Sequence, residues 1–125
     1  MVKGDSIFAK IVSVNVYGES QQSSAGNGAL IQTIPDSPIN LLNDASTTTG
    51  YLIKFTWTEG ISNGGSKVID YNIYYDQGLG VYVLLAQKVT STFYETSTTL
   101  TPGVTYSFKL TSRNSVGSSD HSAVL

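Results

Sequence analysis

The sequence predicts an all-β protein, and two observations carry this prediction. Ser, Thr, Asn and Gln total 43 residues against 16 charged ones, and they are interspersed with Val, Ile, Tyr and Phe, which is typical of half-buried strands. Apolar residues recur at every second position between turn residues, and no window of about 11 residues has the apolar spacing of an amphipathic helix. The 125 residues suffice for one domain, or for one domain and part of another.

The strands are predicted where the alternation is clearest. Short apolar or alternating runs extend from Leu52 to Thr58, from Ile69 to Tyr75, from Tyr82 to Ala86 and from Tyr106 to Ser112. The segments between them are rich in residues that favour turns: Asn63-Gly64-Gly65-Ser66, Asp76-Gln77-Gly78-Leu79-Gly80 and Pro102-Gly103. Short strands closed by turns at this spacing indicate a sandwich or a barrel.

A self-comparison of the sequence shows an internal repeat with an offset of 99 residues. Seven of 21 positions are identical between the segment from Gly4 to Ser24 and the segment from Gly103 to Ala123. The identical pairs are Gly4/Gly103, Lys10/Lys109, Ser13/Ser112, Asn15/Asn114, Gly18/Gly117, Ser20/Ser119 and Ser23/Ser122. Because the Gly, Lys and Asn matches do not follow from a Ser-rich composition, we predict two copies of one structural unit.

The repeat divides the chain at Ile34-Pro35-Asp36-Ser37-Pro38, where the prolines lack a backbone donor and suit a junction. We expect residues 1–34 to form a β-hairpin, the C-terminal strand pair of a preceding repeat, and residues 35–125 to form a second repeat. In this hairpin Ile7 and Ile11 would face one side, with Phe8 and Val12 on the other. Such a strand is either buried on both faces or an edge strand with scattered exposed residues.

Several motifs in residues 35–125 resemble the fibronectin type III family. They are Pro38-Ile39-Asn40-Leu41, Trp57, Tyr71-Asn72-Ile73-Tyr74-Tyr75, Leu100-Thr101-Pro102-Gly103-Val104-Thr105-Tyr106 and Asn114-Ser115-Val116-Gly117-Ser118-Ser119. The Leu-x-Pro-Gly-x-x-Tyr motif is the most specific, and the resemblance implies that the Tyr106 hydroxyl bonds to nearby backbone. The N-terminal segment resembles the last two strands of another copy, although Ile7 stands at the position of Tyr106.

The resemblance implies an immunoglobulin-like sandwich of seven antiparallel strands. The strands would run from Asn40 to Leu42, Leu52 to Thr58, Ile69 to Tyr75, Tyr82 to Ala86, Phe93 to Thr96, Tyr106 to Asn114, and from near Ser122 onward. The residues expected to point inward are Ile53, Phe55, Trp57, Tyr71, Ile73, Tyr75, Tyr94, Leu100, Tyr106, Phe108 and Leu110. Burial of such side chains, at roughly 1.5–3 kcal/mol each, can stabilise a domain without disulfides or metal.

The last strand of the second copy is expected to be truncated. The corresponding strand of the first copy runs to Thr33, whose counterpart would lie seven residues beyond Leu125. Because an unpaired sheet edge invites pairing, we consider strand donation between copies, with self-association through the segment from Gly28 to Thr33. The alternative is that the missing residues belong to a longer chain.

Composition argues against several classes of protein. A net charge of −2 without basic clusters argues against nucleic-acid binding, and the lack of Cys excludes a disulfide scaffold, a thiolate zinc site and a thiol nucleophile. The longest apolar run, from Val81 to Ala86, is far shorter than the roughly 20 residues of a membrane span, so we expect no direct membrane insertion. The N-terminus also lacks the continuous apolar core of a signal peptide.

We expect no catalytic, cofactor-binding or metal-binding residues, and therefore no enzyme. The only histidine, His121, is adjacent to Asp120, but consecutive residues of a strand point to opposite faces. The acidic residues lack the spacing of a calcium loop, and Gly78-Leu79-Gly80 precedes no helix that could bind phosphate.

The expected function is that of a non-catalytic structural or interaction module in a tandem fibronectin type III array. Its role would be scaffolding, spacing or adhesion, with neighbouring modules or other protein subunits as partners. Two alternatives remain: a domain that binds a protein or glycan through its loops, and an accessory module of a larger enzyme. By family analogy, the candidate binding residues are Glu59, Asn63, Lys67, Arg113, Ser118 and Asp120. The family favours an extracellular or cell-surface location, with an intracellular filament or cilium as the alternative.

Overall fold

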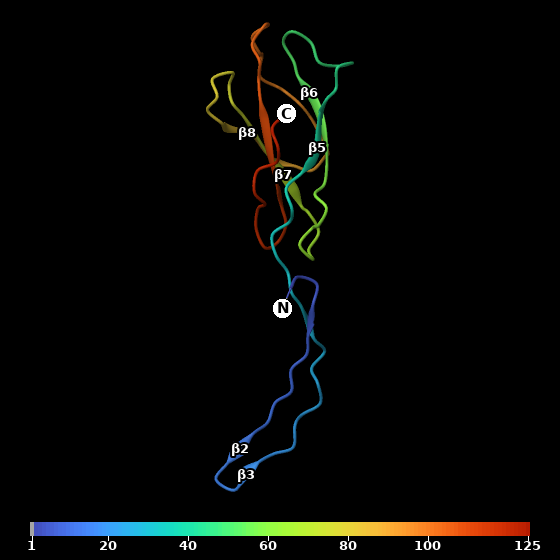
Figure 1. The fold of residues 1–125 in the computed structure, drawn as a ribbon, viewed down its shortest axis with the longest axis vertical. Coiled ribbons are helices and arrows are strands. Elements are labelled where there is room, and N and C mark those ends of the chain that lie inside the picture. Colours follow the sequence, from blue (N-terminus) through green and yellow to red (C-terminus); the bar gives the residue numbers. More distant parts are fainter. Residues whose placement is uncertain (1) are drawn as a thin grey trace.

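The computed structural model describes residues 2–125 as a β-sandwich with a long β-hairpin projecting from one end (Figure 1). The hairpin contains β1 (Ser6–Ile7), β2 (Val14–Asn15), β3 (Gly18–Glu19) and β4 (Ala29–Leu30). The two parts are joined by residues 31–38, and the N-terminal end of the described chain lies beside this linker. Within this part of the chain, no helix is long and apolar enough to cross a membrane.

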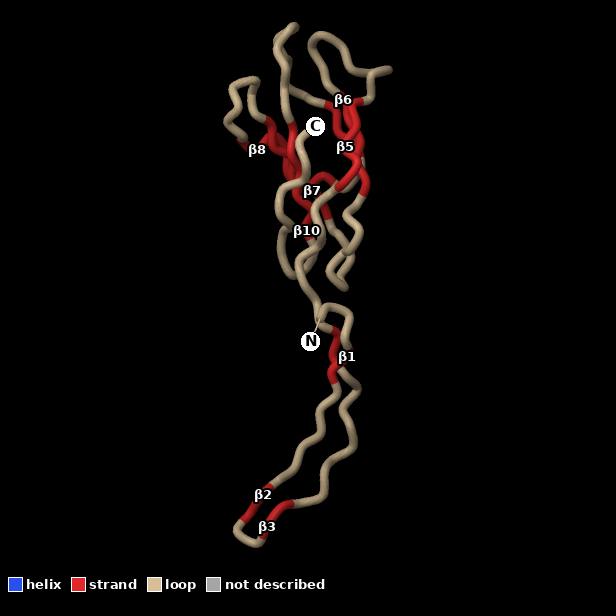
Figure 2. Tube along the Cα trace, viewed as in Figure 1, coloured by secondary structure: helices blue, strands red, loops and turns tan. Residues whose placement is uncertain are grey.

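Two antiparallel three-stranded sheets form the sandwich (Figure 2). The first has the order β5-β6-β9, with β5 at Ile39–Asn43, β6 at Lys54–Thr58 and β9 at Phe93–Glu95. The second has the order β10-β7-β8, with β10 at Phe108–Arg113, β7 at Asp70–Tyr75 and β8 at Val83–Val89. The predicted all-β, immunoglobulin-like sandwich is therefore confirmed.

Residues 119–125 occupy the free edge of β10 as a seventh extended segment. The backbone N–H groups of Ser119, Ser122 and Leu125 donate to the carbonyls of Ser112, Leu110 and Phe108, at 2.8, 2.8 and 3.0 Å. This hydrogen-bonded segment begins at Ser119, earlier than the start of the last strand expected near Ser122. Since residues 108–112 are paired on this side, less of the edge is open than the sequence suggested.

The core lies between the sheets and is built from the inward positions of the alternating strands. Buried apolar residues are Phe55, Trp57, Val68, Tyr71, Ile73, Leu100, Phe108 and Leu110. The partly buried Ile53, Tyr75, Tyr94 and Tyr106 pack against this cluster. All eleven residues expected to point inward therefore contribute to the interior, and Val68, which lies in the loop before β7, is buried with them.

Aromatic rings meet at the centre of this core. Phe55 of β6 lies 4.8 Å from Phe108 of β10, centroid to centroid, and Trp57 meets Tyr71 edge to face at 5.3 Å. These contacts cross from one sheet to the other, so they join the two layers.

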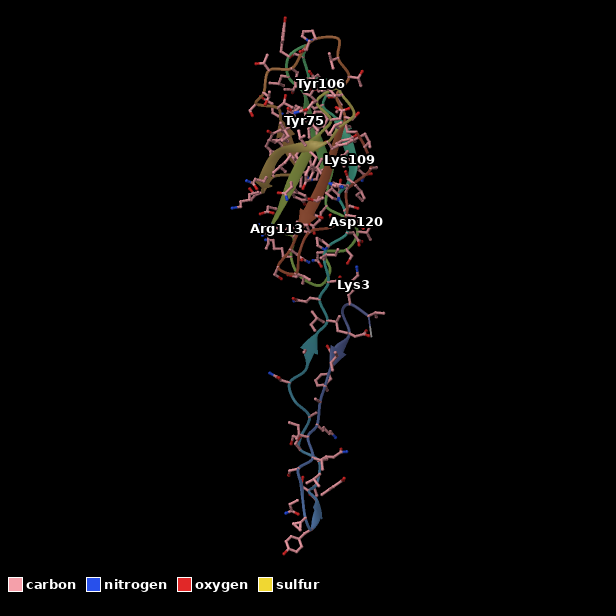
Figure 3. All side chains as sticks on the ribbon, turned by 90° about the vertical axis from the view of Figure 1, so that its left-hand side faces the viewer. Lys3, Tyr75, Tyr106, Lys109, Arg113 and Asp120 are labelled. Carbon is pink, nitrogen blue, oxygen red and sulfur yellow. The ribbon has the colours of Figure 1, made fainter. Side chains whose placement is uncertain are left out.

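Tyr106 forms the expected corner before β10. Its hydroxyl accepts a hydrogen bond from the backbone N–H of Thr101 at 3.1 Å, and Figure 3 places it at the end of the sandwich opposite Lys3. The bond closes the loop that carries Pro102 and Gly103, as the resemblance to the family implied.

The N-terminal hairpin repeats the hydrogen bonds of the β10 edge with the 99-residue offset. Ser20, Ser23 and Gly26 donate their backbone N–H groups to the carbonyls of Ser13, Ile11 and Ala9, at 2.8, 2.9 and 3.0 Å. Side chains repeat too: the Ser20 hydroxyl accepts from the Ser13 N–H at 3.0 Å, as the Ser119 hydroxyl accepts from the Ser112 N–H. The sequence repeat is thus also a repeat in geometry.

The apolar residues of the hairpin are exposed on both faces. Ile11 is 73% exposed, whereas its counterpart Leu110 is fully buried. Phe8, Val12 and Val14 on the other face are exposed as well. Within residues 2–125 no second sheet covers the hairpin, so the exposed arrangement, one of the two expectations for this strand, is the one seen there.

Candidate interaction surface at the linker

The linker lies against the loop between β6 and β7, at the end of the sandwich that faces the hairpin. The Thr33 N–H donates to the Gly64 carbonyl and the Asp36 N–H to the Ser62 carbonyl, both at 2.8 Å. In return, the Ser62 N–H donates to Asp36 Oδ2 at 3.0 Å. Pro35 and Pro38 are both buried here. The linker is thus bonded in place over several residues.

Two glycines make room for this close approach. A Cβ added to Gly60 would lie 2.6 Å from the Ser37 carbonyl oxygen, and one added to Gly64 would overlap the Thr33 carbonyl oxygen. Gly64 also has φ of +76°, a conformation that L side chains rarely adopt. The glycines of this loop are therefore required by the linker that packs on it.

The strand end at β10 provides a second set of contacts. The fully buried Ser112 donates its hydroxyl to the Asp36 carbonyl at 2.7 Å. Asn114, which follows β10 and is 2% exposed, donates its side-chain amide to the carbonyls of Thr33 and Asn63. The linker is thus held from the β6–β7 loop on one side and from the end of β10 on the other.

A shallow hollow beside the linker carries charge. Its lining is Lys3, Thr33, Ile34, Pro35, Asp36, Ser37 and Asp120. Lys3 Nζ lies 4.0 Å from Asp36 Oδ1, with both side chains partly exposed, so this ion pair contributes little. Figure 3 shows Lys3 and Asp120 at the waist between the two parts.

Three of the predicted binding residues have structural partners at this end of the sandwich. Asn63 caps its own loop, since its Oδ1 accepts from the Gly65 N–H at 2.9 Å. Arg113 forms an ion pair with Asp70, which raises the pKa of Arg113 above its ordinary value through a hydrogen bond and the attraction of the carboxylate. Ser118 pairs with Arg113 across the turn after β10.

The other three predicted residues, Glu59, Lys67 and Asp120, are exposed. Burial, with a contribution from the Glu59 carboxylate, raises the pKa of Tyr71. The hydroxyls of Ser66 and Ser115 lie 2.8 Å apart and join the two predicted loops. The loop between β6 and β7 and the loop after β10 therefore lie side by side, and both form hydrogen bonds with the linker.

Sequence reasoning did not single out Ser112, Asn114 or Gly64 as interaction residues. The repeat carried a usable signal, because Ser112 and Asn114 are identical to Ser13 and Asn15 at the same offset. Their linker partners lie 76 and 81 residues away in the chain, and periodicity does not reveal such contacts.

The described residues offer no grouping of three His, Cys, Asp or Glu side chains that could hold a metal ion. His121 packs edge to face against Tyr74, with ring centroids 4.9 Å apart. This contact gives the histidine a packing role on the outer face of the β10-β7-β8 sheet.

Solved structures share the fold at low sequence identity. The chain matches "Crystal structure of domains A168-A170 from titin" with a TM-score of 0.71 and 22% identity, covering 99% of this chain and 40% of that one. It matches the twitchin kinase region from C. elegans with a TM-score of 0.66 and 20% identity, covering 74% of this chain and 16% of that one. The chain therefore spans less than half the length of either structure.

Single-domain structures are matched over nearly their whole length. A Fn3-like protein from Clostridium thermocellum has a TM-score of 0.57 and 23% identity, covering 74% of this chain and 90% of that one. No curated protein sequence matches significantly. The family model of the Fibronectin type III domain matches residues 36–125, which is most of the chain and nearly all of the sandwich. The chain belongs to the fibronectin type III family.

Proposed function

We propose that this chain is a non-catalytic structural module that joins end to end with a preceding repeat in a tandem array. Residues 1–34 would be the last two strands of that repeat. The hydrogen bonds shared by the hairpin and the β10 edge support this assignment. Fibronectin type III domains are typically non-catalytic modules and occur beside other modules in multidomain proteins, as in the titin and twitchin structures.

The observation that carries the proposal is that the linker is hydrogen-bonded to the β6–β7 loop on one side and to the end of β10 on the other. In a domain that binds another molecule through these loops, the backbone groups of the loops would be available to form hydrogen bonds with that molecule. Here the carbonyls of Ser62 and Gly64 accept from linker N–H groups instead. Spacing is therefore a better account of this end of the sandwich than recognition of a protein or glycan.

Strand donation through the segment from Gly28 to Thr33 is less well supported than end-to-end joining. Ala29 and Leu30 pair with Ile7 and Ser6 inside the same hairpin. Thr33 bonds to Gly64 of the same chain. Donation would break both sets of bonds before it formed new ones.

The proposal is tested by the full chain in solution and by a matched pair of variants. Small-angle X-ray scattering should give one extended arrangement of hairpin and sandwich, and scattering that requires many hairpin orientations would overturn the proposal. Gly64→Ala should release the linker and speed hydrogen exchange at the Thr33 and Asp36 amides. Gly80→Ala is the control, because Gly80 has a similar φ of +78° but nothing within 4 Å of an added Cβ. Equal exchange in the two variants would contradict the role given to the loop.

A further inference from the structure

Asn114 connects three separate segments of the chain through one buried side chain. Its Oδ1 accepts from the N–H groups of Val116 and Gly117, at 2.9 and 3.1 Å, and so caps the turn after β10. Its Nδ2 donates to the Thr33 carbonyl at 2.7 Å and to the Asn63 carbonyl at 2.9 Å. Every hydrogen-bonding direction of the amide is used, and the nitrogen serves only long-range contacts.

The side-chain amide of Asn114 thus caps the turn through Oδ1 and binds distant carbonyls through Nδ2. Its counterpart in the hairpin, Asn15, has only the first of these two roles. Asn15 Oδ1 accepts from the Tyr17 N–H at 2.9 Å, so turn capping is preserved. Within residues 2–125, Asn15 Nδ2 bonds to no linker carbonyl, and the residue is exposed. Capping therefore does not require the contacts that Asn114 Nδ2 makes.

Ser112 shows the same separation two residues earlier. The Ser112 backbone N–H is not involved in the linker contact. It donates to the Ser119 hydroxyl, just as the Ser13 N–H donates to the Ser20 hydroxyl. The Ser112 hydroxyl instead donates to the Asp36 carbonyl at 2.7 Å. Ser112 of β10 and Asn114, which follows the strand, thus bind two linker carbonyls three residues apart, those of Asp36 and Thr33.

We infer that Ser112 and Asn114 form a latch that fixes the orientation of one repeat relative to the next by binding the linker carbonyls of residues 36 and 33. The latch recognises extended backbone, so its partner is the linker of the preceding repeat whatever side chains that linker carries. This inference deepens the proposed function, because it names the groups that hold the junction. Both residues hold the linker in position.

The amide is the group that matters at position 114. An Asp there would keep an oxygen to cap the turn, but its second oxygen would face the carbonyl oxygens of Thr33 and Asn63. Those carbonyls would lose their donor and meet a like charge in a buried place. The same substitution at position 15 would meet no such carbonyls.

The test compares Asn114→Asp with Asn15→Asp in the full chain. Residual dipolar couplings should fit one alignment for hairpin and sandwich in the wild type and in Asn15→Asp. Asn114→Asp should need separate alignments, with hydrogen exchange at Thr33 and Asp36 at least about ten-fold faster. A single alignment in Asn114→Asp, or equal loosening by Asn15→Asp, would overturn the latch.

A second pair keeps the test decisive if Asn114→Asp does not fold. Ser112→Ala removes the hydroxyl that binds Asp36 but retains the backbone bond to Ser119, and Ser13→Ala is its matched control. Exchange at Asp36 should rise in Ser112→Ala only, and no rise would count against the latch. A wild type that itself needs separate alignments refutes the proposed function, whereas a rigid wild type with inert variants refutes only the latch.

Discussion

Arg113 lies across from Asp70 where β10 pairs with β7, and its guanidinium binds the buried carboxylate through two hydrogen bonds. Nε is 2.9 Å from Oδ1, and Nη2 contacts Oδ2. Asp70 is 3% exposed, so the arginine is its main source of compensation for lost hydration. In the hairpin the position of Arg113 is taken by Val14. The pair is thus a feature of the complete sandwich.

Removing the arginine should destabilise the sandwich by leaving a buried carboxylate without its partner. We expect Arg113→Ala to lower the free energy of unfolding, and the double variant Asp70→Asn with Arg113→Ala to recover part of the loss. Chemical denaturation of both variants measures this. A double variant less stable than Arg113→Ala would contradict the explanation.

Equivalent apolar positions should respond very differently to truncation. Leu110→Ala should cost about 2–5 kcal/mol, because it opens a cavity in the core, whereas Ile11→Ala in the exposed hairpin should cost less than about 0.5 kcal/mol. Thermal unfolding of the full chain compares them directly. Similar losses would show that the hairpin is covered in solution.

The Tyr106 hydroxyl should contribute modestly to stability. Tyr106→Phe keeps the ring but removes the acceptor for the Thr101 N–H, so a loss of about 0.5–1.5 kcal/mol is expected. Equilibrium denaturation gives the value. A neutral substitution would mean that water replaces the hydroxyl without cost.

Acid should destabilise the sandwich partly through Asp76. Burial opposes ionisation of this side chain, but the N–H groups of Ser107, Gly78 and Gly80 outweigh it and lower its pKa below the ordinary 3.8. A carboxyl with a lowered pKa in the folded state contributes stability above pH 3.8, and this is lost as the pH falls through the folded-state pKa. Unfolding measured from about pH 5 down to pH 2 should therefore show a shallower loss in Asp76→Asn than in the wild type.

Asp44 is the internal comparison for that titration. Hydrogen bonds from Ser46 lower the pKa of Asp44 as well, since they outweigh the opposing effect of burial. Asp44 lies elsewhere in the domain, in the loop after β5. Asp44→Asn should change the pH dependence independently of Asp76→Asn. Identical pH profiles for the wild type and Asp76→Asn would refute the assignment to Asp76.

The architecture of the sandwich could be predicted from the amino-acid sequence. Alternation along Lys54–Thr58 and Asp70–Tyr75 places Phe55, Trp57 and Ile73 inward, and burial of those rings and side chains leaves few ways to stack the strands. The Leu-x-Pro-Gly-x-x-Tyr motif located the Tyr106 corner, and the 99-residue repeat located the hairpin. These signals are local, so they can be read from neighbouring positions.

The contacts made at the ends of these strands could not be predicted from the sequence and emerge only in the folded chain. The sequence offered the loops around Asn63 and Arg113 as candidate binding loops, but it did not reveal that Asn63 shares Asn114 with the linker or that Arg113 pairs with Asp70. It also left open whether the apolar faces of the hairpin are covered. These outcomes depend on groups 43 to 81 residues apart in the sequence, which come together only in the folded chain. Hydrogen bonds and ion pairs need that final geometry, because their strength depends on distance and angle, whereas burial of apolar side chains depends mainly on which face they occupy.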